Sequence, residues 1–241
     1  MDLKIIYEDG DVLVVDKPAG MVIFEERINP SSLNSSGPFL INELIKSRPE
    51  LKNVGEAPRY GIVHRLDKDT SGILLVAKNS EVLIFLQKQF KSREVDKKYI
   101  ALVTGVIKED SGVVHTLMGR SPQDPRKQKC YPLAPNTQHL TPNKREAITE
   151  YKVLERFPSY TLLDVTIKTG RKHQIRCHLT YIHHPIIGDK MYGFKDSPIL
   201  EGLDRQFLHA TTIKIKLPSG GIKEFKSDLP EELQKILKEL T

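Results

Sequence analysis

Cysteines and long apolar runs are both scarce in this sequence, and each scarcity excludes a class of protein. The chain of 241 residues has two cysteines, Cys130 and Cys177. They are too few and too far apart along the chain for a disulfide framework or a Cys-x-x-Cys metal site. Every apolar run is far shorter than the ~18 residues that suggest a membrane helix. The acidic N-terminus lacks a basic region followed by an apolar segment, so we expect no signal peptide and a cytoplasmic protein.

The composition is typical of a soluble globular protein with a sizeable core. Hydrophobic residues make up 39% of the chain and charged residues 28%, which are ordinary values for such proteins. A chain of this length forms one large domain or two small ones. We expect a single domain over residues 1–241 that is monomeric, with loop-rich insertions at residues 25–58 and 119–146.

The positive charge of the chain is partly concentrated in one segment. The formal net charge is +6 and the isoelectric point about 9.1. Residues 119–146 are rich in proline and hold two acids against six bases, which are Arg120, Arg126, Lys127, Lys129, Lys144 and Arg145. A basic loop of this kind can bind the phosphates of a polyanionic partner. Mild basicity is also common in proteins without such a partner, so charge alone leaves the partner open.

Hydrophobic periodicity predicts an α+β protein with a mostly antiparallel sheet. Strand-like runs bounded by turn residues occur at residues 3–9, 11–18, 72–78, 97–107, 112–118, 147–157, 160–170 and 206–218. Helical patterns occur at residues 38–48, 80–93, 171–184 and 227–240. Ser80 is expected to cap the second of these helices. The first two strands are predicted to form a hairpin.

The segment "HRLDKDTSG", residues 64–72, allows four interpretations. Counted from Asp67, it resembles the first half of an EF-hand calcium loop, but position 12 is Lys78, where a bidentate Glu is required. "DTSG" also fits acid proteases, which need two such loops, whereas this sequence has one. It can equally be a polar turn in which Gly72 supplies an unusual backbone angle. Finally, one aspartate can act alone in an enzyme that needs no metal.

A second polar segment is "TGRKHQIRCHLTYIHHPIIGDKMYG", residues 169–193. Its four histidines and one cysteine suggest zinc, but His173 and His178 are five residues apart and lie on different sides of a helix. The bases that crowd the first turns of the predicted helix are Arg171, Lys172, His173 and Arg176. Such a helix start can bind an anion. A solvated, charged helix end is the simpler alternative.

Together the two segments resemble the RluA-type family of RNA pseudouridine synthases. "HRLDKDTSGILLVAK" is similar to the signature of that family. Its other motifs are resembled, in order, by "VLVVDKPAGM", "KKYIALVTG", "TGRKHQIRCHL" with "HPIIGDKMYG", and "RQFLHA". The resemblance runs from about residue 5 to about residue 225. It implies the pseudouridine synthase fold: a long, bent, mostly antiparallel sheet with flanking helices and loops, and two subdomains around a central cleft.

The resemblance also implies the reaction, the isomerisation of specific uridines in structured rRNA or tRNA. The uracil is detached at its N-glycosidic bond, turned over and rejoined to the ribose through C5. The reaction needs no redox step and no group donor, so we expect neither a cofactor nor a metal. By the match, Asp67 is the essential carboxylate. It either attacks the sugar carbon or abstracts a sugar proton, and both routes stay open.

The same resemblance assigns roles to residues elsewhere in the chain. Arg176 is expected to keep Asp67 charged. Tyr99 is expected to stack on the flipped base, and Leu208 to pack against it. Arg65 is expected to fill the gap that the base leaves in the RNA, whereas Asp69 is a residue of the turn. The full set of expected RNA-binding residues is Arg65, His64, Arg171, Lys172, Lys17 and Lys127.

Three features depart from the family pattern. Relatives often carry a separate RNA-binding domain at the N-terminus, whereas here the pattern starts near Met1, so we expect a stand-alone catalytic domain whose own loops select the RNA. The segment "VIFEERINPSS" replaces a His-Pro-like turn after "KPAGM". Lys172 stands where relatives often have Thr. The alternative function is an RNA-binding protein on the same fold that has no catalytic activity.

Overall fold

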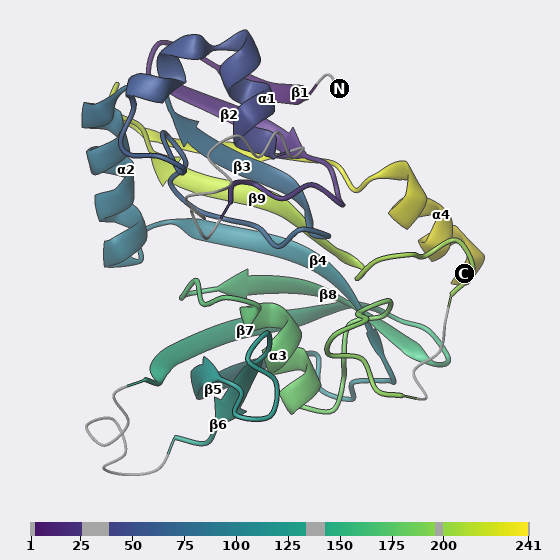
Figure 1. Cartoon of the computed structure of the whole chain (residues 1–241). Coiled ribbons are helices and arrows are strands. Elements are labelled where there is room, and N and C mark those ends of the chain that lie inside the picture. Colours follow the sequence, from purple (N-terminus) through teal and green to yellow (C-terminus); the bar gives the residue numbers. More distant parts are fainter. Residues whose placement is uncertain (1–2, 26–38, 134–142, 196–199, 241) are drawn as a thin grey trace. The chain divides into compact units, whose positions relative to one another are not determined.

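The computed structural model describes residues 3–25, 39–133, 143–195 and 200–240. These residues form the predicted α+β fold, a large, mostly antiparallel sheet with four α-helices (Figure 1). The helices are α1 (Leu40–Ser47), α2 (Ser80–Ser92), α3 (Gln174–Tyr181) and α4 (Glu231–Leu240). The chain divides into two compact units: unit 1 is Met1–Asp96 with Ala210–Asp228, and unit 2 is Lys97–His209 with Leu229–Thr241.

Unit 1 contains the N-terminal strands and most of β9. Its strands are β1 (Lys4–Glu8), β2 (Val12–Lys17), β3 (Ser71–Ala77), β9 (Leu208–Lys216) and β10 (Ile222–Lys226). Their order is β1-β2-β3-β9, and β10 pairs with β9. The predicted hairpin of β1 and β2 is confirmed, and β2 pairs antiparallel with β3 so that Val15 lies opposite Leu74.

The core of unit 1 is centred on β3, whose seven residues are all buried. A strand buried on both faces needs the uninterrupted apolar run that the sequence has there. Helix α2 packs on β3 and buries Val82, Leu83 and Leu86. Its cap differs from the prediction: the side chain of Asn79, not Ser80, accepts the N–H of Val82 at 2.9 Å.

Unit 2 holds the five strands between β3 and β9 in the chain. They are β4 (Asp96–Thr104), β5 (Ser111–Arg120), β6 (Gln128–Tyr131), β7 (Arg145–Arg156) and β8 (Tyr160–Ile167). Their order is β4-β8-β7-β5-β6, every neighbouring pair is antiparallel, and α3 packs on β6 and β7 (Figure 1). Under α3 lies an apolar cluster of Met118, Cys130, Ala147, Cys177 and Tyr192.

Parts of the predicted loop-rich insertions have regular structure. Residues 119–146 contain the end of β5 and all of β6, and residues 25–58 contain α1 and the 3₁₀-helix η2 (Pro49–Asn53). The remaining parts of these predictions, residues 26–38 and 134–142, lie outside the described residues. Strand β10 was not predicted at all. Short polar strands such as β6 lack apolar alternation, so the sequence gives little signal for them, and they form by pairing with a neighbouring strand, here β5.

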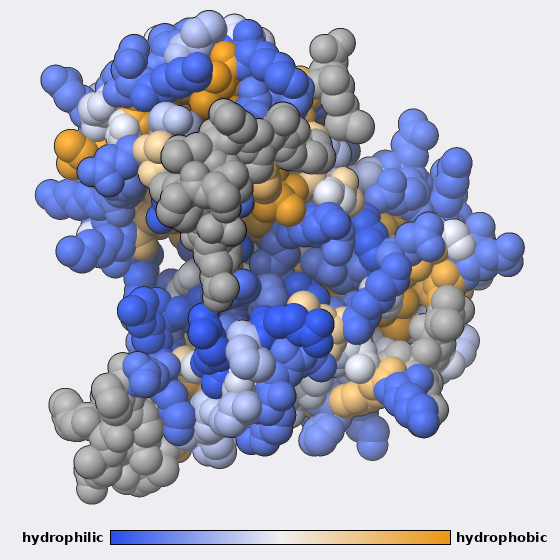
Figure 2. Space-filling view, in the orientation of Figure 1, coloured by the Kyte–Doolittle hydropathy of each residue, from blue (hydrophilic) through white to orange (hydrophobic). Residues whose placement is uncertain are grey.

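The face of the molecule drawn in Figure 2 is mainly hydrophilic where its residues are coloured. On the face drawn in Figure 2, hydrophobic residues occupy small, separate areas. The most exposed large ones are Ile84, Val113 and Ile222. None of the helices in the described part of the chain combines the length and the apolar character that crossing a membrane requires.

Candidate active site

In unit 1 the predicted active-site segment forms a tight turn that leads into β3. The backbone N–H of Thr70 donates to the carbonyl of Asp67 at 3.2 Å. The side chains of Asp67 and Asp69 are half-buried, and Thr70 is buried. Gly72 has φ +113°, and a Cβ there would lie 2.2 Å from the carbonyl oxygen of Ala210. Only glycine fits this close approach, so the unusual backbone angle expected at Gly72 is confirmed.

The buried side chain of Lys17 is hydrogen-bonded to this turn. Its side chain is 0% exposed, and its ammonium donates to the carbonyls of Pro18, Met21 and Lys68, each at 2.8 Å. A buried ammonium is stable only with such a complete set of acceptors. It is not available to a phosphate, so we assign Lys17 a structural role instead of the predicted RNA contact. Through Lys68 it fixes the residue next to Asp67.

His64 is also an anchor within unit 1. Its Nε2 accepts the backbone N–H of Leu75 on β3 at 3.0 Å, which places the ring proton on Nδ1. The ring stacks on Phe90 of α2, with 5.1 Å between centroids. The neighbouring Arg65 is exposed. Of these two expected RNA-binding residues, Arg65 is thus the more accessible.

In unit 2, Tyr99 and Leu208 are both buried. Tyr99 lies on β4 opposite Val165 of β8. The carbonyl of Leu208 accepts a hydrogen bond from Arg205 at 3.2 Å, and Arg205 also forms an ion pair of 2.7 Å with Glu232 of α4. Sequence reasoning missed Arg205 and Glu232. Their only signal is an arginine in the motif "RQFLHA" and an acid early in the last helix.

Arg176 lies on α3 and is buried. In unit 2 it pairs with Asp189, which accepts from Nε at 2.7 Å and from Nη2 at 2.8 Å. Burial raises the pKa of Asp189, but the hydrogen bonds and charge of Arg176 outweigh it, so the net pKa lies below the usual value. Asp189 belongs to "HPIIGDKMYG", and sequence reasoning gave it no role. The structure shows it as a direct partner of Arg176.

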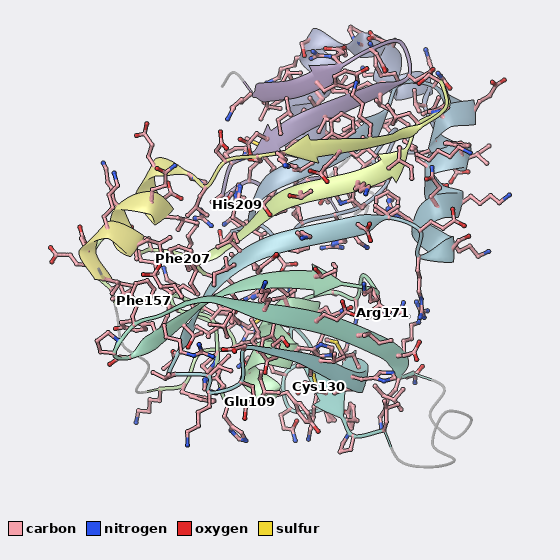
Figure 3. All side chains as sticks on the ribbon, turned by 180° about the vertical axis from the view of Figure 1, so that it is seen from behind. Glu109, Cys130, Phe157, Arg171, Phe207 and His209 are labelled. Atoms are coloured by element: carbon pink, nitrogen blue, oxygen red, sulfur yellow. The ribbon has the colours of Figure 1, made fainter. Side chains whose placement is uncertain are left out.

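Arg171, which lies just before α3, makes hydrogen bonds at the start of this helix. The Nε of Arg171 donates to the carbonyl of Glu146 at 2.9 Å, and Figure 3 shows Arg171 near the end of the sheet where β7 begins. Its backbone N–H donates to the side chain of Gln174 at 3.0 Å. Lys172 is exposed. The Nε atoms of Arg171 and Arg176 thus donate to different groups, the Glu146 carbonyl and the Asp189 carboxylate.

Two of the described histidines of unit 2, His178 and His184, have different partners. His178 lies between the hydroxyls of Thr116 and Thr149, at 3.0 and 2.8 Å. His184 contacts the carbonyl of Thr104 at 2.8 Å. Within the described residues, no group of three or more His, Cys, Asp and Glu side chains could hold a metal ion.

The two cysteines are neighbours in space although they are distant in sequence. Their sulfur atoms lie 3.0 Å apart, between β6 and α3, and both thiols are free and buried (Figure 3 labels Cys130). The hydrogen bond between them lowers the pKa of Cys130 and raises that of Cys177. No disulfide joins them.

Lysines of the basic segment around β6 lie close to two tyrosines, Tyr131 and Tyr192, to which sequence reasoning gave no role. The Nζ atoms of Lys144 and Lys129 lie 3.8 and 5.6 Å from the ring centroid of Tyr131. Lys127 lies 5.9 Å from the ring centroid of Tyr192. Arg126 is different, because both Nε and Nη2 bind Asp124, at 3.0 and 2.9 Å. One of the six predicted cations is therefore paired locally.

The matching family model and two similar relatives are named as pseudouridine or pseudouridylate synthases. Residues 11–181 match the family model described as RNA pseudouridylate synthase. A protein of Bacillus subtilis named uncharacterized RNA pseudouridine synthase YlyB is 38% identical over the whole chain and 73% of its own length. The ribosomal large subunit pseudouridine synthase D of Nitrosomonas europaea is 40% identical over 98% of this chain, which spans 64% of that relative.

A solved structure supports the same relationship. Human RNA pseudouridylate synthase domain containing 1 superposes with a TM-score of 0.72 and 27% identity, over 95% of this chain and 84% of the other. A second human structure, RNA pseudouridylate synthase domain containing 4, has a TM-score of 0.76 at 24% identity, over 98% of this chain and 92% of the other, and supports the fold.

Proposed function

We propose, because this chain belongs to the RNA pseudouridylate synthase family, that it isomerises specific uridines in structured rRNA or tRNA with Asp67 as the reacting carboxylate. The family match over residues 11–181 carries this proposal, since it includes Asp67, Tyr99 and Arg176. Leu208 lies beyond the matched residues. Its role is carried by the resemblance of "FLHA" alone.

The names of the relatives favour one substrate class. The relative from Nitrosomonas europaea is named for the large ribosomal subunit, and so is one from Yersinia pestis that is 35% identical over 99% of this chain. We therefore take large-subunit rRNA as the first substrate to test and tRNA as the second.

The isomerisation requires one ionised carboxylate as its reacting protein group. The bond from uracil N1 to the sugar breaks, a bond from C5 to the same sugar carbon forms, the C5 proton leaves to solvent, and N1 takes up a proton from solvent. Asp67 would either form a covalent bond to the sugar or take a sugar proton. The anchoring of Lys68 by the buried Lys17 favours such a role, because it holds the chain next to the carboxylate in one position.

The remaining roles stay predictions from the resemblance. Tyr99 would stack on the extruded base and Leu208 would pack against it. Arg176 would keep the reacting carboxylate ionised. Arg65, which is exposed, would occupy the space that the base leaves in the RNA.

Release of tritium from uridine labelled at C5 tests the reaction. Wild-type protein should release tritium from large-subunit rRNA or tRNA transcripts, and Asp67→Asn should slow this by at least about 10³-fold. Asp69→Asn is the matched control, since it removes a half-buried carboxylate two residues away in the same turn, and it should retain activity. Equal activity of Asp67→Asn and wild type would show that another residue reacts. Binding without release would favour the catalytically inactive alternative.

RNA binding should depend on the cations around β6. Lys127, Lys129 and Lys144 all lie close to aromatic rings, an arrangement suited to phosphates with stacked bases. Log affinity falls as log salt concentration rises, and each Lys→Gln change should make this fall shallower by roughly 0.7–0.9 per decade of salt. Arg126→Gln is the control, because Asp124 already neutralises that arginine, and it should change the slope less. Equal slopes for all the variants would refute this surface as the RNA contact.

A further inference from the structure

Asp189 and Arg176 form a buried, two-point ion pair. The carboxylate accepts from Nε at 2.7 Å and from Nη2 at 2.8 Å, and the two side chains are 0% and 8% exposed. A pair of this geometry fixes the plane of the guanidinium group as well as its position.

The loop that carries Asp189 is itself held in place. The Oδ1 atom also accepts the backbone N–H groups of Met191 and Tyr192, at 2.9 and 3.0 Å. The preceding Gly188 has φ +75°, and a Cβ there would lie 2.1 Å from the carbonyl oxygen of Arg205. The turn therefore requires glycine. The carboxylate is oriented by its own backbone independently of Arg176.

Tyr192 restrains Arg176 through a second contact. The guanidinium carbon lies 5.1 Å from the centroid of the Tyr192 ring. The Tyr192 hydroxyl accepts the N–H of Gln128 at 2.7 Å and lies 3.0 Å from Nδ1 of His173. The guanidinium group thus contacts a fixed carboxylate and an anchored ring.

Stability is a weak explanation for such a pair. Removing two charges from water costs about as much as their attraction returns, so a well-packed apolar pair is often equally stable. What the ion pair provides is orientation. Asp189 binds the edge formed by Nε and Nη2, and this turns the edge that carries Nη1 away from Asp189.

We propose that Asp189 is a positioning residue for the uridine isomerisation, which it serves by fixing the orientation of the Arg176 guanidinium group. The inference rests on the proposed function of this chain. It deepens that function by adding a residue that acts through Arg176. Misorientation of a group that acts in the transition state should lower kcat and leave substrate binding nearly unchanged.

The variant Asp189→Asn tests this with little disturbance of the loop. The Oδ1 atom, which bonds Met191, Tyr192 and Nη2, is retained, whereas the amide replaces the oxygen that accepts from Nε of Arg176. We expect kcat for tritium release to fall by about 10²-fold and KM to change by less than about threefold. Asp189→Glu keeps the charge and moves the carboxylate by one methylene, and it should give an intermediate kcat.

A double-mutant cycle separates positioning from a merely structural role. In an Arg176→Met background, Asp189→Asn should cause no further fall in kcat, because its target is gone. Asp164→Asn removes another carboxylate of unit 2, one paired with Lys98 near the surface at 3.4 Å, and should leave kcat unchanged. Thermal unfolding of each variant ensures that rates refer to folded protein.

The possible results separate the two proposals. A fall in kcat that disappears in the Arg176→Met background supports positioning by Asp189. Wild-type kcat in Asp189→Asn, or in Asp189→Glu should the first variant not fold, overturns it while the proposed function stands. So does an equal fall in both backgrounds. If the wild type releases no tritium from any RNA, the proposed function fails and this inference fails with it.

Discussion

Mild acid should destabilise the protein through one buried histidine. His178 on α3 is 0% exposed and bonded to the hydroxyls of Thr116 and Thr149. Burial, and after it the charge of nearby His115, lower the pKa of His178 from 6.5 to about 4. The unfolded chain thus takes up a proton in a pH range where the folded chain does not.

The direction and size of the effect follow from this difference. His178 imposes no penalty above about pH 6.5, and the stability is lost progressively as the pH falls from there to about 4. At about 1.4 kcal/mol for each unit, the full loss is about 3 kcal/mol, of which about 2 kcal/mol is reached near pH 5. Acids such as Glu8, whose pKa the hydrogen bond from Arg48 lowers to about 2, lose their contribution mainly at lower pH.

Urea unfolding followed by circular dichroism at several pH values between about 8 and 5 measures this loss. Compared with the wild type, His178→Gln should be less stable near neutral pH but should lose about 2 kcal/mol less on acidification to about pH 5. His183→Asn is the control, because His183 is exposed and its φ of +66° suits asparagine, and it should keep the wild-type dependence. Parallel pH profiles for wild type and His178→Gln would refute the reasoning.

Three further changes should act on the free energy of unfolding. Gly72→Ala should cost more than about 3 kcal/mol, because its Cβ would lie 2.2 Å from the carbonyl oxygen of Ala210, and a near-wild-type denaturation midpoint would contradict this geometry. Lys17→Met should cost about 2–4 kcal/mol, since three carbonyls, one of them fully buried, lose their donor, and a stability gain in urea unfolding would contradict it. Asn79→Ala should cost about 1 kcal/mol through loss of the α2 cap, whereas Ser80→Ala should cost less, and the reverse order would restore Ser80 as the cap.

The elements with strong local signals could be predicted from the sequence. The apolar run of β3, the amphipathic pattern of α2 and the Gly10 turn between β1 and β2 each depend on residues close together in the chain. Strands β6 and β10 could not be predicted in the same way. Their residues alternate weakly, and they form because β5 and β9 offer unpaired backbone groups.

The residues of the candidate site also differ in how much of their role can be read from nearby sequence. Asp67 lies in a dense local motif, so its chemical character is visible in the sequence. Lys17 is misleading, since a lysine normally indicates the surface, and its burial depends on a carbonyl 51 residues away. Asp189 meets Arg176 through a turn that only the folded loop creates. Residues that act through a distant partner therefore need the structure to be found.

The buried thiol pair has a practical consequence for labelling. Both cysteines of the chain are buried against each other, so the native protein presents little reactive thiol at its surface. A single cysteine introduced at the exposed Gln123, in the turn that precedes β6, should react selectively with a maleimide dye while Cys130 and Cys177 stay unmodified. Fluorescence from that dye would then test whether RNA reaches the basic segment, without any change to the native cysteines.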